Sequence, residues 1–197
     1  RKCSPETKKE ICQKIKNTVE QFACERFNYI NMEDQSLIDK NVLLEDHLVS
    51  REFCEGDCAG KLLITDEQNT LSVMVNEEDH LRIQSIMPGL DIEGAYERAN
   101  YIDDIICQGE NVAFDEKLGY LTSCPTNLGT GLRASVMLHL PAITSCGQIK
   151  SLVSLMTKIG LTVRGLYGEG SEAEGCLYQV SNQITLGVSE KDAIEKL

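Results

Sequence analysis

The chain has no tryptophan, and aromatic residues make up only 5% of its 197 residues. Its core must therefore be mostly aliphatic, and a hydrophobic content of 42% is enough for a domain of this length. It also lacks any apolar run of about 18 residues or more, so we expect no transmembrane helix. Its first residues, Arg1 to Pro5, lack the apolar stretch of a signal peptide.

Basic residues are in short supply as well. The 19 lysines and arginines are outnumbered by 31 acidic residues, which gives a formal net charge of −12. Proteins that bind nucleic acids or anionic membranes in general have the opposite charge. We therefore expect neither as a partner, and any bound anion must be held by arginines that gather locally.

The cysteines lack the spacing of a disulfide framework, because they are odd in number, nine, and scattered along the chain. This pattern is typical of reduced thiols in a cytoplasm. Cys54 and Cys58 have the spacing of half a zinc site, but no second pair or nearby histidine completes it. We therefore predict no metal site in the protein.

Helical and alternating patterns indicate an α+β protein, with one domain over residues 1–197. Ser4 and Asp91 are expected helix caps, and Gly160 is expected to end a helix. Strands come in adjacent pairs separated by helices, which favours an antiparallel sheet with helices on one side. The expected helices are 4–24, 34–44, 91–107, 145–159 and one beginning at 192. The expected strands are 61–65, 71–75, 81–86, 134–140, 162–166, 177–180 and 183–186.

Three arginines stand beside glycines or at strand ends: Arg82, Arg133 and Arg164. A planar guanidinium grips phosphate through two charge-assisted hydrogen bonds, so three that converge would suit a triphosphate. Taken singly, each is more typical of a surface arginine or of a structural ion pair. The carboxylates of 76-NEEDH-80 follow a predicted strand, where they suit proton transfer or cation binding, or simply form a solvated turn. The chain contains neither a P-loop motif nor the glycine loop of ordinary protein kinases.

Two motifs together resemble the signatures of the guanidino kinases, the family of creatine and arginine kinases. They are 76-NEEDHLRIQ-84 and 124-CPTNLGTGLRASVMLHLP-141. Downstream, 164-RGLYGEGSEAEG-175 and 181-SNQITLG-187 resemble the family's substrate-side loop and last core strand. The similarity runs from about His47 to the end of the chain. It implies a glutamine-synthetase-like catalytic core, with an antiparallel sheet flanked by helices.

Details of these motifs resemble one branch of the family, the bacterial protein-arginine kinases. They include Thr126, Ser135 and Met137, where kinases of small metabolites usually have histidine at the last position. The resemblance implies ATP-dependent phosphorylation of exposed arginine side chains in proteins, in a bacterial cytoplasm. It further implies a role in protein quality control or stress regulation, an activator protein and a protease–chaperone machinery as partners.

The resemblance also implies a role for each matching residue. Glu78 and Glu169 correspond to carboxylates that orient the guanidinium, and Cys124 to a reactive cysteine beside it. Magnesium would be held mainly through the phosphates of ATP. The implied ATP-binding residues are His47, Arg82, Arg133, Ala134, Ser135, Val136, Met137, Arg164, Gly165, Leu166, Tyr167, Gly168 and Glu169.

Two parts of the family pattern have no match in this chain. One is a Ser-Ser-Arg-x-Arg motif on an N-terminal strand, and the other is a C-terminal helical domain that recognises phosphoarginine and mediates dimerisation. We therefore expect the chain to be a fragment. Two alternatives stay open on the sequence: a guanidino kinase for a small metabolite such as free arginine, and a regulator that binds nucleotide without turnover.

Overall fold

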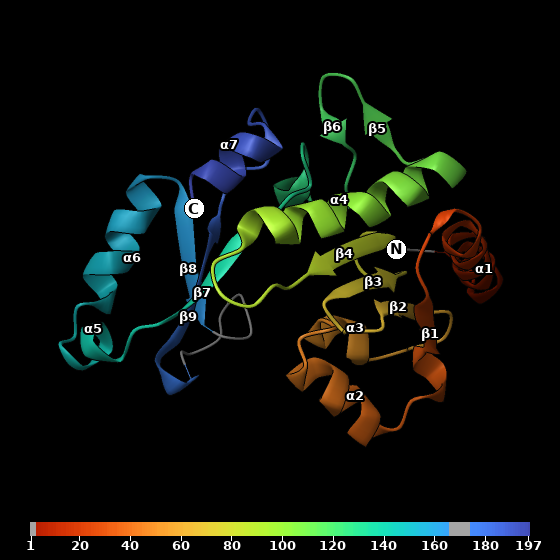
Figure 1. Ribbon diagram of the computed structural model, residues 1–197, viewed down its shortest axis with the longest axis horizontal. Coiled ribbons are helices and arrows are strands. Elements are labelled where there is room, and N and C mark those ends of the chain that lie inside the picture. The colour runs from red at the N-terminus through yellow and green to blue at the C-terminus, as the bar shows by residue number, and fades with distance from the viewer. Residues whose placement is uncertain (1–2, 166–173) are drawn as a thin grey trace. The chain divides into compact units, whose positions relative to one another are not determined.

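A computed structural model describes residues 3–165 and 174–197 (Figure 1). Its contacts divide the chain into two compact units, Arg1–Val112 and Ala113–Leu197, called unit 1 and unit 2 below. Helices and antiparallel strand pairs occur in both units, so the predicted α+β class is confirmed. Within the described residues, no helix combines the length and the apolar character that crossing a membrane requires.

Unit 1 is built around a four-stranded antiparallel sheet in the order β1-β2-β3-β4. Every residue of β2 and β3 is buried, so these central strands are covered on both faces. The strands are β1 (Phe27–Asn31), β2 (Leu62–Asp66), β3 (Leu71–Val75) and β4 (Leu81–Ser85). The sequence predicted β2 to β4 but not β1, whose apolar residues Phe27, Tyr29 and Ile30 follow a polar stretch.

Helices lie on both faces of this sheet, and the expectation of helices on one side is wrong (Figure 1). One face packs against α1 (Pro5–Phe22) and α4 (Ile92–Gly109), which contribute Ile15, Val19 and Ile102. The other face carries Leu63 and Met74 and packs near α2 (Leu37–Glu45) and α3 (Arg51–Cys54). Apolar residues at both parities of β2 and β3 require this second layer, because successive side chains point to opposite faces.

The helix ends of unit 1 follow the predicted caps. The Ser4 hydroxyl accepts a hydrogen bond from the Thr7 backbone N–H at 3.2 Å, with Pro5 at the first helical position. The Asp91 carboxylate accepts one from the Gly94 N–H at 3.0 Å. A 3₁₀ turn, η1 (Met32–Asp34), links β1 to α2.

Unit 2 contains a three-stranded antiparallel sheet in the order β7-β9-β8 and a short hairpin, β5-β6. The predicted helix at 145–159 begins later than expected, at Ile149, because Gly147 has a φ of +68° and separates it from a short helix that ends at Ser145. The predicted strand at 183–186 is wrong, since β9 ends at Asn182. The elements are β5 (Phe114–Asp115), β6 (Gly119–Tyr120), η2 (Pro125–Asn127), β7 (Ser135–His139), α5 (Pro141–Ser145), α6 (Ile149–Lys158), β8 (Leu161–Gly165), η3 (Glu174–Cys176), β9 (Leu177–Asn182) and α7 (Glu190–Glu195).

Candidate active site

The turn that joins β3 to β4, residues 76–80, carries the carboxylate cluster of unit 1. Val75 pairs with Leu81 across the hairpin, and the Asn76 backbone N–H donates to the His80 carbonyl at 2.9 Å. Asn76 has a φ of +65°, a left-handed conformation that asparagine tolerates better than most residues. The turn therefore has a defined geometry that starts from Asn76.

The Asn76 side chain ties this turn to the rest of unit 1. It is buried, and its amide nitrogen donates to the carbonyls of Lys8 at 3.0 Å and Gly60 at 2.7 Å. The same nitrogen lies 3.4 Å from the Cys12 sulfur. Burial raises the pKa of the Cys12 thiol, although the contact with Asn76 opposes the shift. The side-chain oxygen Oδ1 of Asn76 lies 3.1 Å from Nδ1 of His80, so both polar groups of the amide are used.

Glu77 connects three neighbours of the turn. Its side chain is only 9% exposed, and Oε1 accepts a hydrogen bond from the Ser50 hydroxyl at 3.0 Å. Oε2 accepts one from the Glu78 backbone N–H, and Oε1 lies 3.8 Å from Nη1 of Arg82. Since the Arg82 side chain is 48% exposed, this ion pair contributes little stability and mainly orients the guanidinium. The predicted residues Glu78, which is exposed, and Arg82 thus belong to one hairpin.

His47 lies beside the same hairpin. It follows α2 with a φ of +57°, and its carbonyl accepts a hydrogen bond from the Gln84 side chain on β4. Arg82 and Gln84 pair with Met74 and Ser72, so they share the face of β4 that is turned toward α2 and α3. Unit 1 therefore brings the His47 backbone, Glu78 and Arg82 into one neighbourhood.

In unit 2, residues 121–134 form an irregular loop, called here the CPTN loop. The Cys124 sulfur lies 3.0 Å from the Thr126 hydroxyl. The Thr185 hydroxyl shares its proton between two loop carbonyls, that of Thr126 at 3.0 Å and that of Leu128 at 2.7 Å. These contacts explain why residues 183–186 are not a strand, because their polar groups hold the loop instead of pairing along a sheet.

Gly129 allows the loop backbone to approach its own support. With a φ of +112°, it lies so close to Thr185 that an added Cβ would be 2.2 Å from the Thr185 carbonyl oxygen. The Thr130 N–H donates to that same oxygen at 3.0 Å. At Gly129 the close approach is to the protein's own chain.

Asn182 fixes the end of the CPTN loop where β7 begins. Its Oδ1 accepts a hydrogen bond from the Ala134 N–H at 2.8 Å, and its Nδ2 donates to the carbonyls of Leu132 at 3.0 Å and Ile184 at 3.1 Å. Asn182 and Ala134 are both buried. Arg133 stands between these anchored residues, and it is exposed. The predicted phosphate ligand is therefore placed by the backbone on either side of it.

One face of the three-stranded sheet collects further predicted residues. Met137 and Arg164 both pair with Gln179 of the central strand, and antiparallel partners share a face. Ser135 lies on this face too, and its hydroxyl accepts a hydrogen bond from the Gln179 side chain at 3.0 Å. Val136 points to the opposite face. Gly165 ends β8, whereas Leu166, Tyr167, Gly168 and Glu169 lie outside the described residues.

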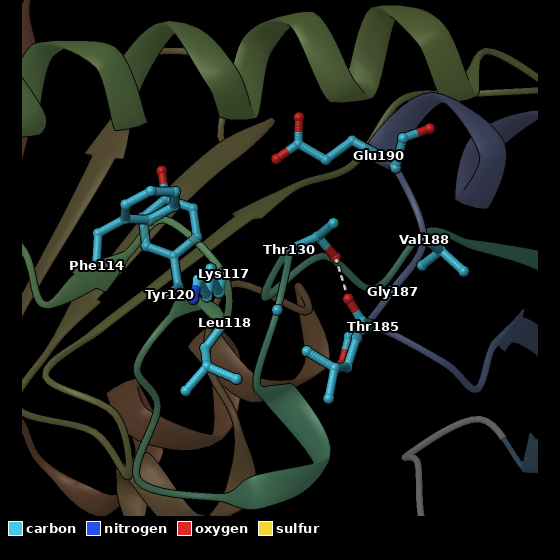
Figure 2. Close-up of a pocket in the computed structure, with 13 residues that line it drawn as sticks. Phe114, Lys117, Leu118, Tyr120, Thr130, Thr185, Gly187, Val188 and Glu190 are labelled. Carbon is cyan, nitrogen blue, oxygen red and sulfur yellow. Dashed lines mark hydrogen bonds between the residues drawn. The ribbon is translucent and has the colours of Figure 1, made fainter.

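A pocket of about 400 Å³ is lined by residues of the β5–β6 hairpin, by Gly129 and Thr130 of the CPTN loop and by residues 185–190 (Figure 2). Phe114 and Tyr120 form an edge-to-face pair on one wall, with ring centroids 5.2 Å apart, and Glu190 lies on the other. Between them the Thr130 hydroxyl donates to the Thr185 carbonyl at 3.4 Å. Among the residues that the structure describes, no predicted catalytic or ATP-binding residue lines this pocket.

Sequence reasoning missed the residues that hold the predicted ones in place: Ser50, Asn182, Thr185 and Gln179. Their partners are distant along the chain, and no local spacing marks them. A polar residue amid the apolar residues of a strand was the available signal for Gln179 and Asn182, because buried polar side chains need partners.

The chain belongs to the ATP:guanido phosphotransferase family, and residues 10–197 match its C-terminal catalytic domain. Among curated relatives, a protein-arginine kinase of Caldanaerobacter subterraneus subsp. tengcongensis is 52% identical over 172 residues, which are 87% of this chain and 51% of the relative. A protein-arginine kinase of Clostridium kluyveri is 44% identical over 198 residues, which are 100% of this chain and 57% of the relative. The chain thus spans about half the length of the curated relatives it matches.

Solved structures of guanidino kinases share this fold. The duplicated taurocyamine kinase of Schistosoma mansoni, with bound transition-state analogue components, is 30% identical with a TM-score of 0.84. That match covers 98% of this chain and 28% of the kinase chain. A lombricine kinase has a TM-score of 0.81 at 24% identity, over 98% of this chain and 57% of the other. The predicted guanidino kinase core is therefore confirmed.

Proposed function

We propose that this chain is the catalytic domain of an ATP-dependent protein-arginine kinase. The observation that carries the proposal is the β3–β4 hairpin, which presents the exposed carboxylate of Glu78 within four positions of the phosphate-binding candidate Arg82. Identities of 44% and 52% to curated protein-arginine kinases favour a protein acceptor over a small metabolite.

The acceptor chemistry explains why carboxylates are needed. An arginine guanidinium is protonated at neutral pH, with a pKa above about 12, and is a poor nucleophile. In the proposal, Glu78 and Glu169 bind its N–H groups, align one nitrogen with the γ-phosphate and accept a proton as the N–P bond forms. The bond between the γ-phosphorus and the bridging oxygen breaks, and ADP leaves. Cys124, beside the Thr126 hydroxyl, is proposed to lie near the guanidinium.

Arginines supply the complementary charge for the phosphates. Arg82, Arg133 and Arg164 are proposed to bind the phosphate oxygens, with the backbone of the ATP-binding segments around them. Within residues 3–165 and 174–197, no group of three His, Cys, Asp or Glu residues could hold a metal ion. We accordingly propose that Mg²⁺ is carried by the nucleotide phosphates, where it neutralises charge during the transfer.

The proposal extends to location and partners. A bacterial cytoplasm is consistent with nine free thiols, and the net charge of −12 favours arginine-rich protein substrates. An activator protein, a protease–chaperone machinery and homodimerisation through a C-terminal domain remain predictions from the family resemblance. A co-purification from the source organism with and without ATP would test the first two.

The deciding experiment is transfer of label from γ-labelled ATP to an arginine-rich protein, with free arginine in parallel. The product should lose its label in acid and keep it in base, because an N–P bond is acid-labile. Glu78→Gln should lower the rate by roughly 10² to 10⁴-fold, the usual contribution of general acid–base catalysis. Since Glu78 is exposed, this variant should unfold at the same temperature as the wild type.

Other outcomes would point to the alternatives. Label on free arginine and none on protein would indicate a small-metabolite kinase. Tight ATP binding without label on either acceptor would indicate a nucleotide-binding regulator. Transfer that is unaffected by Glu78→Gln would contradict the assignment of the catalytic carboxylate.

A further inference from the structure

Ser50 lies at a junction between α3 and the β3–β4 turn. Its hydroxyl accepts a hydrogen bond from the Phe53 backbone N–H at 3.1 Å, which caps α3. The same hydroxyl donates to Oε1 of Glu77 at 3.0 Å, and the Ser50 N–H lies 3.4 Å from the Met74 sulfur. One side chain therefore connects the start of a helix to the carboxylate turn.

The two roles of the hydroxyl fix its direction. A serine hydroxyl has one proton to donate and lone pairs with which to accept. Because a lone pair of the hydroxyl oxygen accepts from the Phe53 N–H, the hydroxyl proton is directed to Glu77. The helix cap therefore sets the orientation of the donated hydrogen bond. The α3 backbone is itself held by the buried Phe53, which is 0% exposed. Ser50 thus presents its proton from a rigid support.

Glu77 passes this constraint to the reacting groups. Its carboxylate is largely removed from water, so its few partners decide where the two oxygens point. Its Oε1 accepts a hydrogen bond from the Ser50 hydroxyl and lies near the Arg82 guanidinium. Its Oε2 accepts a hydrogen bond from the Glu78 backbone N–H. A rotation of the Glu77 carboxylate would therefore shift the Glu78 backbone and release the Arg82 guanidinium together.

We propose that Ser50 is a positioning residue of the phosphotransfer site, which acts through Glu77 on Glu78 and Arg82. The inference rests on the proposed function for its consequences in catalysis. The role assigned to Ser50 is indirect, because its hydroxyl contacts Glu77 and the Phe53 N–H. Its loss should reduce turnover through Glu78 and weaken nucleotide binding through Arg82.

The key variant is Ser50→Asp, because it separates the two roles. Aspartate is a good helix cap, so α3 keeps its acceptor for the Phe53 N–H. At neutral pH it has no proton to donate and places a second negative charge against Glu77. We expect kcat to fall roughly 10- to 100-fold, the effect of small misplacements of reacting groups, and KM for ATP to rise. Ser50→Thr keeps both hydrogen bonds and should restore kcat to within about twofold of the wild type.

Ser36 provides a matched control in the same unit. It caps α2 by accepting the Asp39 N–H at 3.2 Å, and its hydroxyl donates to the Asp39 carboxylate, within the same helix turn, at 2.6 Å. Ser36→Asp makes the same chemical change at a cap without a link to the catalytic turn. It should leave kcat and KM unchanged.

A readout without turnover keeps this test separate from the proposed function. The Glu78 amide proton should shift in the NMR spectrum and exchange faster with solvent in Ser50→Asp, and ATP should bind more weakly. If wild-type protein transfers no phosphate, the proposed function fails, and the Glu78 amide and ATP affinity still decide the role of Ser50. An unchanged amide and unchanged ATP affinity in Ser50→Asp would overturn the proposal. If that variant does not fold, Ser50→Gly removes the donor at a small capping cost and decides in its place.

Discussion

The β3–β4 turn of unit 1 and the CPTN loop of unit 2 both carry predicted catalytic residues, but they are held in different ways. Side chains hold the turn. Asn76 donates to backbone carbonyls of α1 and of Gly60, which precedes β2, and Glu77 forms an ion pair with Arg82 on β4. The loop is held largely through its own backbone, which lies against Thr185 at Gly129. A loop N–H donates a hydrogen bond to the Asn182 side chain, and a loop carbonyl accepts one from the Thr185 hydroxyl.

The difference predicts where each segment tolerates change. A side-chain support fails when a particular polar group is removed, because its partners lose their hydrogen bonds. A backbone support fails when the approach of two chains is blocked, whatever the chemistry of the added group. We therefore expect removal of a polar side chain to destabilise the turn in unit 1. An added methyl group at the point of close approach should destabilise the loop in unit 2.

The largest effect is expected for Gly129→Ala. The added Cβ would lie 2.2 Å from the Thr185 carbonyl oxygen, at a φ of +112° that alanine rarely adopts. We expect a loss of roughly 3 kcal/mol or more in the free energy of unfolding, from strain together with the clash. Chemical denaturation followed by circular dichroism would measure it.

Gly147→Ala is the matched control for this substitution. Gly147 also has a positive φ, +68°, but a Cβ there would meet no atom within 4 Å. Its cost should be only about 1–2 kcal/mol, that of the left-handed conformation. Equal losses in the two variants would show that close approach is not what holds the CPTN loop.

A smaller loss is expected for Asn76→Ala in the turn. The substitution removes the amide donor to the Lys8 and Gly60 carbonyls, and leaves the Cys12 thiol as the side-chain donor to Gly60. We expect a loss of about 2–3 kcal/mol. Asn76→Gly would relieve any strain at the φ of +65° but would still lack the amide.

The comparison between these two variants sharpens the distinction between the units. If the amide holds the turn, Asn76→Gly should recover less than half of the stability that Asn76→Ala loses. Full recovery in Asn76→Gly would instead show that backbone conformation dominates at the turn, as it does at Gly129. Thermal unfolding of both variants side by side would give the answer.

The smallest effect concerns pH. Burial alone would raise the pKa of Asp66, but hydrogen bonds from Thr70, Leu71 and Arg98 outweigh it and hold the pKa below its ordinary value. The folded state therefore binds this proton less readily than the unfolded state. The stabilisation is present above the ordinary aspartate pKa of about 4 and is lost as pH falls through the lower folded value.

Asp66→Asn removes this titration and provides the measurement. The difference in the free energy of unfolding between wild type and variant should decrease by on the order of 1 kcal/mol as pH falls from 7 to 3. The polar supports of the CPTN loop, Asn182 and Thr185, are uncharged at every pH in this range. Hydrogen exchange should accordingly show the acid-sensitive opening in unit 1. A difference that stays constant with pH would contradict the lowered pKa.

Much of the secondary structure could be predicted from local pattern. The caps at Ser4 and Asp91 act within three residues along the chain, and so does the helix end at Gly160, whose N–H donates to Thr157. The wrong strand prediction at 183–186 depends instead on distant partners. Residues 183–186 alternate like a strand, yet the Thr185 side chain is committed to loop carbonyls at Thr126 and Leu128. Local alternation contains no information about such a commitment.

The candidate site was predictable as a set of residues but not as an arrangement. The resemblance named Glu78 and Arg82, and the hairpin places them on one element. It did not name Ser50, because serine before a short helix reads as a cap and nothing more. The second function of its hydroxyl depends on a carboxylate 27 positions away along the chain. Only the folded backbone brings the two together.

The direction in which the supports lie along the chain has a consequence for biosynthesis. Asn76 is anchored by Lys8 and Gly60, which precede it, so its partners already exist when the ribosome adds it. Gly129 lies against Thr185, which comes later in the chain. Thr130 and Leu128 also form hydrogen bonds with Thr185, which is 55 and 57 positions downstream of them. At about 5–20 residues per second, the CPTN loop waits several seconds for its support. During translation, the nascent chain can therefore order its carboxylate turn while the loop that bears Cys124 is still unsupported.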